Sequence, residues 1–361
     1  MNVCIIGGGG GTSNLMRILR PLVESRGIMS LTGLITISDD GGSTGILKES
    51  YKTTAFGDVG KVLMEASDPS NESLTVFNEA LLFRFADGPL KGHTVRNILM
   101  TALELQCRGR TSNSSSKRSA FGQTCTLGAM KEILHIPKNI NVLPISNDSC
   151  SVQLKTRKEV VLTKGQFSSS TFRIQDQYQD KNDVLVTLNG QGCGMSDAAG
   201  QALDIADIVV IAPGHTHGTI LPALATEGLR ETLMNFKGKI VVIVPFFNRK
   251  GIAQTVDWTA TDYVEVYTEY MGTSPDYVIM QETKEKEGDI YFGQETFQCV
   301  KSTDMPVGII GIKGKIRGGC SDGQCKSDAI VRSPATMDPE MVREIFKEKI
   351  LVCTCEKCQR K

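Results

Sequence analysis

Short apolar runs recur along this 361-residue chain, and they limit its possible folds more than any other feature. They are rich in Val, Ile and Leu and are bounded by Gly, Pro and Asn. Runs of this kind are typical of parallel strands that helices cover on both faces. They span residues 3–6, 31–37, 140–145, 208–212, 240–244 and 277–280.

Segments with the periodicity of amphipathic helices lie between these runs. They span residues 13–24, 58–66, 74–85, 95–105, 127–134, 196–205 and 259–271. Alternating strands and helices predict an α/β fold with a doubly wound, mostly parallel sheet.

Two segments break this alternation. Residues 107–119 are basic, polar and rich in serine, which predicts a surface loop. Residues 151–188 alternate in polarity and predict a small antiparallel β insertion. We place the main domain at residues 1–285 and a C-terminal extension with a cysteine-rich tail at residues 286–361.

Charge and hydropathy narrow the class of protein. The 40 basic and 40 acidic residues cancel, so we expect no nucleic-acid partner. The longest uncharged stretch, residues 208–226, contains two Pro, two Gly and two His, and we therefore expect no membrane span. The first residues run directly into an apolar strand pattern without a signal peptide. We expect a cytoplasmic protein, with a homodimer as the ordinary assembly of such folds.

Eleven cysteines fall into two groups. Eight are scattered, and an odd total without a secretion signal argues against a disulfide framework. The other three lie in the tail "CTCEKC", at Cys353, Cys355 and Cys358, where zinc binding with help from Cys320 and Cys325 is one possibility and free thiols are the other.

The segment "VCIIGGGGGTSNLMRIL" predicts a strand, a turn of five glycines and a helix beginning at Thr12 or Ser13. Glycine amides at a helix N-terminus bind phosphate well. A strict dinucleotide motif needs a small third residue where this chain has Thr12 or Ser13, which weakens an NAD interpretation. No Lys follows the glycines, which excludes a Walker-type loop.

Five segments in order resemble the YvcK/CofD family (UPF0052). They read "GGGGGTSNL", "ITISDDGGSTGIL", "FGDVGKVLMEAS", "LKGHTVRNILMTAL" and "ADIVVIAPGHTHGTILPAL". The resemblance extends from Val3 to about Gln281 and implies a Rossmann-like, three-layer fold. The forms "DDGGSTG" and "GDVGKVL" are closer to the gluconeogenesis-factor (YvcK) branch than to the CofD branch.

Each branch implies a function. The first implies a regulatory protein that binds nucleotide sugars such as UDP-N-acetylglucosamine and is linked to central carbon metabolism and cell shape. The alternative is a metal-dependent 2-phospho-L-lactate transferase that uses a guanosine diphosphate-linked donor and a deazaflavin acceptor. A third interpretation, an NAD-dependent oxidoreductase, rests on the glycines alone.

The chain departs from the family pattern at several positions. The family usually has a basic residue where this chain has Ile46, and it reads "GDIRN" where this chain has Gly60 and Lys61. It also reads "GHSLGN" where this chain has Arg96 before Asn97. One cation is lost and another appears a helix away, so a phosphate contact could have moved. His215 and His217 stand where the family usually has Ser and Tyr. They could hydrogen-bond the ligand, or hold a metal together with Asp39 or Asp40.

Ligands of open parallel sheets bind beyond the carboxyl ends of the strands. The five segments that resemble the family can therefore converge on one site. Asp58 is either a helix N-cap or a functional residue, while His93 and Asn97 can read a base or sugar edge. The expected ligand-binding residues are Gly8, Gly9, Gly10, Gly11, Thr12, Asp40, Gly41, Gly42, Ser43, Asp58, His93, Asn97, Gly214, His215, His217 and Asn248.

The pair Asp39–Asp40 follows the second predicted strand. One of these carboxylates takes the place of a ribose-binding acid, and the other could help to hold Mg²⁺ on a diphosphate. We expect Asp40 to face the ligand and Asp39 to be its structural partner.

Overall fold

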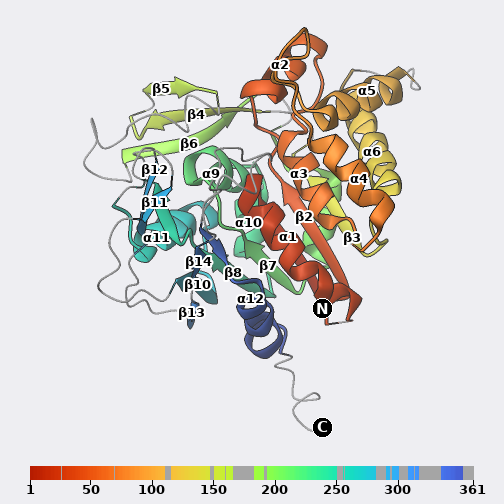
Figure 1. The fold of residues 1–361 in the computed structure, drawn as a ribbon. Coiled ribbons are helices and arrows are strands. Elements are labelled where there is room, and N and C mark those ends of the chain that lie inside the picture. Colours follow the sequence, from red (N-terminus) through yellow and green to blue (C-terminus); the bar gives the residue numbers. More distant parts are fainter. Residues whose placement is uncertain are drawn as a thin grey trace.

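A computed structural model gives the fold (Figure 1). It describes residues 1–25, 27–68, 70–109, 115–146, 150–158, 160–165, 183–190, 193–249, 255, 257–281, 290–292, 295–300, 308–312, 314–316 and 335–352. The cysteine-rich tail, together with Cys320 and Cys325, lies outside these ranges.

A seven-stranded sheet forms the centre of the protein, in the order β13-β10-β8-β7-β1-β2-β3. All six neighbouring pairs are parallel. The strands are β1 (Asn2–Gly7), β2 (Ser30–Ile35), β3 (Ile140–Pro144), β7 (Ile208–Ile211), β8 (Lys239–Ile243), β10 (Tyr277–Gln281) and β13 (Gly308–Ile312). The chain builds outward from β1 through β2 to β3 and then returns to place β7 on the other side of β1. This reversal is the switch point of a doubly wound fold, which confirms the predicted fold class.

Helices cover both faces of the sheet (Figure 1). The main ones are α1 (Gly9–Glu24), α2 (Gly42–Tyr51), α3 (Gly57–Ala66), α4 (Glu72–Leu82), α5 (Val95–Gly109), α6 (Ser115–Ile133), α8 (Asp197–Asp204), α9 (Leu221–Leu224), α10 (Leu229–Met234), α11 (Ala260–Met271) and α12 (Pro339–Ile345). Two π-helical turns, η3 (Thr216–Ile220) and η4 (Phe346–Ile350), extend α9 and α12.

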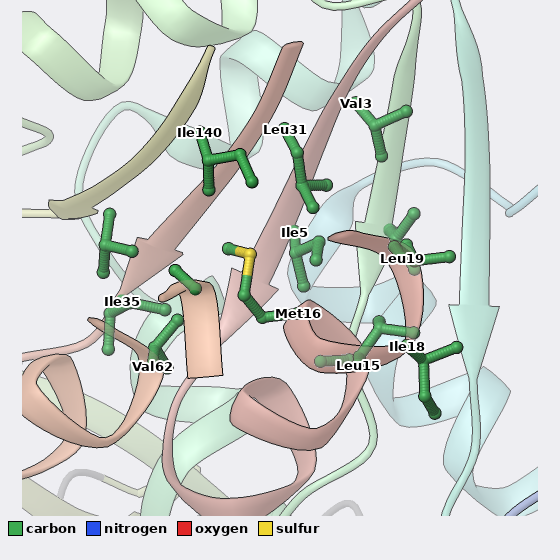
Figure 2. Packing of buried hydrophobic residues seen from close by; sticks show 14 of the residues in the cluster. Val3, Ile5, Leu15, Met16, Ile18, Leu19, Leu31, Ile35, Val62 and Ile140 are labelled. Atoms are coloured by element: carbon green, nitrogen blue, oxygen red, sulfur yellow. The ribbon is translucent and has the colours of Figure 1, made fainter. Parts of the chain in front are cut away.

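Alternate strand residues face two separate cores, which makes the fold three-layered. Val3 and Ile5 of β1 pack with α1, α3 and α12, as Figure 2 shows for α1 and for Val62 of α3. Cys4 and Ile6 pack on the opposite face with α8, α9, α10 and α11. These side chains are almost completely buried, as expected for strands covered on both faces.

The β insertion is also confirmed. It is a three-stranded antiparallel sheet of β4 (Ser151–Thr156), β5 (Val161–Lys164) and β6 (Val184–Asn189), in the order β5-β4-β6. Figure 1 shows it beside the main sheet. Val152, Leu154, Val184 and Val186 anchor it to the core on the α9 face.

The C-terminal segment contributes to the main sheet, so residue 285 is not the end of this body. β13 pairs with β10, and α12 packs Val342 and Ile345 into the same core as α1. Smaller strands form a three-stranded sheet and a two-stranded antiparallel sheet. They are β9 (Phe247–Arg249), β11 (Ile290–Phe292), β12 (Glu295–Cys299), β14 (Gly314–Ile316) and β15 (Ala335–Met337).

Two predictions from the sequence are wrong, one about residues 107–119 and one about disulfides. The segment 107–119 is largely helical: α5 continues to Gly109 and α6 begins at Ser115, with residues 110–114 outside the described ranges. The expectation of no disulfides also fails, because the structure pairs Cys107 with Cys125 and Cys150 with Cys193. Their Cα atoms lie 6.0 and 5.6 Å apart, within the range a disulfide spans, and this proximity is set by the fold rather than by sequence spacing.

Gly11 sets the distance between the first turn of α1 and the loop after β7. A Cβ atom added at Gly11 would lie 1.7 Å from the backbone oxygen of Pro213. Gly11→Ala should therefore lower the free energy of unfolding by more than about 1 kcal/mol in urea titrations, despite the higher helix propensity of Ala.

Gly128→Ala is the matched control, since Gly128 is also a helical glycine but a Cβ there meets nothing within 4 Å. We expect it to stabilise the protein by up to about 1 kcal/mol. Equal responses of the two variants would contradict the close approach at Gly11.

The two disulfides can be tested by peptide mapping under non-reducing conditions. Blocking free thiols before digestion should leave Cys107 linked to Cys125, and Cys150 to Cys193, because each pair lies at bonding distance. Cys4, a buried free thiol, should be modified only after unfolding. Modification of all five without a reductant would contradict both assignments.

Candidate functional site

The glycine turn lies at the carboxyl end of β1, next to the switch point of the sheet. β1 ends at Gly7 and α1 begins at Gly9, earlier than the predicted Thr12 or Ser13, so the later glycines form the first turn of the helix. Gly9 has φ +65°, which favours glycine. The amides of this first turn are the free N–H groups to which anions bind.

Three other segments converge on Gly8. A Cβ atom added there would lie 2.9 Å from Thr36 Cγ2, 3.1 Å from Asp58 Oδ2 and 3.2 Å from Thr219 Cγ2. These residues follow β2, begin α3 and follow β7, respectively. The structure therefore brings together segments that are far apart in sequence, as the prediction required.

Two hydroxyls hold the turn from inside. Thr12 Oγ1 donates to the carbonyl of Gly8 at 3.1 Å, and Ser13 Oγ donates to that of Gly10 at 3.0 Å. Both side chains are fully buried. Thr12 thus supports the shape of the turn from within the fold.

A pair of carboxylates lies beside the glycine turn. Asp39 Oδ1 accepts a hydrogen bond from the amide of Gly41 at 2.9 Å, and Asp58 Oδ1 pairs with Lys61 Nζ at 2.9 Å. Burial, followed by repulsion from Asp58, raises the pKa of Asp39 to about 6. Asp58 is not the helix N-cap: that position is Phe56, and Asp58 lies in the first turn of α3 with its carboxylate toward the glycines.

Asp40 faces the β insertion instead. A Cβ atom added at Gly165, which has φ +92°, would lie 2.4 Å from Asp40 Oδ2. Of the two aspartates, Asp39 is therefore the one beside Asp58 and the glycine turn. Lys48 lies near both aspartates: burial lowers its pKa, and Asp40 and Asp39 oppose that effect.

Lys48 was missed in the sequence because α2 was not predicted. No helix was expected directly after the aspartates, whereas Gly41 is an N-cap and Gly42 begins α2. A signal for Lys48 was its spacing from Thr44: residues four apart lie on the same face of a helix.

A second polar group joins the start of α2 to α5. Ser43 Oγ lies 2.9 Å from His93 Nδ1, and Asn97 Nδ2 donates to Ser43 Oγ at 3.1 Å. Asn97 also lies 3.5 Å from Thr44 Oγ1. Three predicted site residues, Ser43, His93 and Asn97, therefore form one hydrogen-bonded cluster.

Arg96 lies beneath this cluster, where its Nη2 donates to Asn97 Oδ1 at 3.5 Å. Its side chain is 1% exposed, and a Cβ atom at Gly60 would lie 2.9 Å from Arg96 Cδ and Nε. Arg96 thus fills the space that Gly60 leaves open. The suggestion that Arg96 replaces a phosphate contact is wrong for this reason.

The turn after β7 completes the site. His215 caps η3, with its Nδ1 accepting a hydrogen bond from the amide of Gly218 at 3.0 Å. Thr219 Oγ1 donates to the carbonyl of His215 at 2.7 Å. This turn lies against α1 through the contact of Gly11 with Pro213.

Two predicted residues point into the core rather than toward the turns. His217 is 1% exposed and packs edge-on against Trp258, and burial, with His215 adding to it, lowers its pKa to about 3. Asn248 donates to the carbonyl of Trp258 at 2.8 Å and accepts from Tyr263 OH at 2.6 Å. His215 and His217 therefore lie in different environments, one at a helix cap and one in an aromatic cluster.

Within the described ranges, no group of three or more His, Cys, Asp or Glu residues is arranged to hold a metal ion. No helix there is long and apolar enough to cross a membrane.

The fold and these turns define a class: a doubly wound α/β protein with a glycine turn and a helix N-terminus at its switch point. A family model described as 2-phospho-L-lactate transferase CofD matches residues 3–305. The chain belongs to this family, as the sequence resemblance predicted.

Individual relatives are similar over most of their length. A protein of Aquifex aeolicus is 27% identical over 277 residues, covering 75% of each chain. A protein of Halalkalibacterium halodurans named gluconeogenesis factor is 25% identical over 273 residues, covering 75% of this chain and 74% of the relative. The crystal structure of protein BH3568 from Bacillus halodurans superposes with a TM-score of 0.73 at 22% identity, covering 96% of this chain and 99% of that one, and supports the fold.

The pKa of Asp39 generates a stability prediction. Because the folded-state value, about 6, lies above the ordinary 3.8, the folded protein binds the extra proton between about pH 4 and 6. Stability should fall as pH rises through this window, by on the order of 3 kcal/mol. Asp39→Asn should remove this dependence in urea titrations at a series of pH values.

Asp40→Asn, at the neighbouring position, should retain the dependence. If Asp39→Asn and the unsubstituted protein show the same pH profile, Asp39 does not carry the raised pKa.

Proposed function

We propose that this protein is a regulatory protein that binds a nucleotide sugar of the UDP-N-acetylglucosamine type. The supporting observation is the convergence at Gly8: two glycine-containing turns, after β1 and after β7, lie side by side at the switch point. Two adjacent turns with helix N-termini suit the two phosphates of a diphosphate.

Each part of the site has a separate task in this proposal. The amides of Gly9, Gly10 and Gly11 bind one phosphate, and the turn Gly214–His215 binds the other. The cluster of Ser43, His93 and Asn97 presents hydroxyl, imidazole and amide groups, which hydrogen-bond sugar or base edges.

Magnesium fits this arrangement through Asp39. Mg²⁺ is commonly held by one or two carboxylates together with substrate phosphates, and Asp39 lies close to the carboxylate of Asp58 beside the glycine turn. A cation there would relieve the repulsion between these carboxylates and neutralise the diphosphate. Asp40 faces the β insertion and would contact the ligand only from the direction of the insertion.

The biological setting is proposed by analogy. The relative named gluconeogenesis factor favours a role in central carbon metabolism, and the resemblance adds cell shape. We place the protein in the cytoplasm as a homodimer. Zinc at the C-terminal cysteines is a separate proposal.

Isothermal titration calorimetry with UDP-N-acetylglucosamine, UDP-glucose, GDP and NAD tests the proposal. We expect heat with the uridine nucleotides and none with NAD. Gly8→Val should weaken uridine-nucleotide binding at least about tenfold, because its side chain would fill the space toward Thr36, Asp58 and Thr219.

Gly128→Ala is the control and should leave the affinity unchanged, with circular dichroism confirming that both variants are folded. No heat with any uridine nucleotide would overturn the proposal. Heat with GDP alone would instead favour the transferase alternative.

A further inference from the structure

A buried carboxylate on α5 holds the loop between α2 and α3, residues 52–56. Glu104 is 0% exposed. Its Oε2 accepts a hydrogen bond from the amide of Thr54 at 2.7 Å, and its Oε1 accepts one from the hydroxyl of the same residue at 2.8 Å. One side chain therefore accepts from both donors of Thr54, which fixes the position and the orientation of the loop.

Arg108, one turn further along α5, completes this contact. Its Nη2 donates to Glu104 Oε1, and its Nη1 donates to the backbone oxygen of Lys52 at 2.6 Å. Lys52 is the C-cap of α2 and has a left-handed backbone, with φ 53°. The pair Glu104–Arg108 thus holds the loop at two points, where it leaves α2 and at Thr54.

The loop leads directly to the candidate nucleotide site. Gly57, three residues after Thr54, begins α3 and packs so closely on α2 that an added Cβ atom would overlap Thr44 Oγ1. The next residue is Asp58, whose Oδ2 would lie 3.1 Å from a Cβ atom added at Gly8. A shift of the loop at Thr54 would therefore move a carboxylate that lies against the glycine turn.

Helix α5 supports the site from both ends of α2. Asn97 donates to Ser43 Oγ at 3.1 Å, at the start of α2. Glu104, about two turns further along α5, holds the loop that follows α2. The two ends of α2 are therefore fixed to the same helix.

The energetics of this pair favour a positioning role. Burial raises the pKa of Glu104, while the hydrogen bonds from Thr54 and the charge of Arg108 oppose that effect. Replacing a buried ion pair by apolar residues of similar volume is often neutral or stabilising. Stability alone therefore does not explain a buried charge here, whereas a fixed geometry for Thr54 does.

We propose that Glu104 is a positioning residue of the candidate nucleotide site, and that it sets, through Thr54, where Gly57 and Asp58 lie against the glycine turn. Because its side chain has no exposed surface, Glu104 acts through these residues and does not touch the ligand. The effect on ligand affinity rests on the proposed function, whereas the effect on the position of Asp58 does not.

Glu104→Gln tests this proposal, because the amide leaves a single acceptor oxygen for the donors of Thr54 and Arg108. In the free protein, the NMR amide signals of residues 8–11 and 57–60 should shift, although none of these residues touches Glu104 directly. The affinity for UDP-N-acetylglucosamine, measured by calorimetry, should fall at least about fivefold.

Two control variants separate positioning from a general loss of stability. Glu132→Gln changes an exposed carboxylate on α6 and should move neither readout. Val342→Ala opens a cavity in the core at α12, so it should lower stability while leaving the signals of residues 8–11 and the affinity unchanged.

Thr54 provides a second test that does not require the Glu104 variant to fold. Thr54→Val removes only the hydroxyl donor and should shift the same amide signals by a smaller amount, whereas Thr54→Ser keeps the hydroxyl and should leave them in place. Matching spectra of Thr54→Val and Thr54→Ser at residues 8–11 would contradict the transmission through Thr54.

Unchanged amide signals at residues 8–11 in Glu104→Gln would overturn the proposal, and so would equal shifts in Val342→Ala. If the signals shift but the unsubstituted protein binds no uridine nucleotide, Glu104 keeps its role in placing Asp58 and the proposed function fails instead.

Discussion

The close contact between the first turn of α1 and the loop after β7 is the constraint on which the site depends. Only a glycine at position 11 lets the helix approach the carbonyl of Pro213. This contact places the two glycine turns side by side at the point where the order of the strands reverses. In an open α/β sheet that point is where ligands bind, and here both turns present helix N-termini.

The charges around this point follow from the same geometry. Asp39 lies in the loop after β2 and Asp58 lies at the start of α3. Burial, together with the proximity of Asp58, raises the pKa of Asp39. Lys61 compensates Asp58, while Lys48 approaches from α2. The result is a partly buried acidic pair with nearby cations, which a diphosphate with its counter-ion would complete.

The sequence predicted the sheet well because parallel strands buried on both faces leave a direct record of continuous apolar residues. It also identified the segments that converge on Gly8, since each follows a strand or begins a helix. The sequence analysis assigned the ligand to Asp40, whereas the structure places Asp39 beside Asp58 and Asp40 against Gly165. The two carboxylates lie directly before the start of α2 at Gly42, which was not predicted. His217 and Asn248 match site motifs but are held by Trp258 and Tyr263, contacts that exist only in the folded chain. The disulfides depend on long-range pairing and left no local signal, whereas the seventh strand, "GIIGI", is a short apolar run that the sequence analysis did not include.

Hydrogen–deuterium exchange with and without UDP-N-acetylglucosamine tests the central claim most directly. If the ligand lies across the two turns, amide protection should rise at residues 7–13, 39–44 and 214–219 together. Little change in protection is expected in α12, which lies at the opposite end of the sheet from the two turns. Protection that appears elsewhere, or at only one of the two turns, would contradict the account of a diphosphate bound between them.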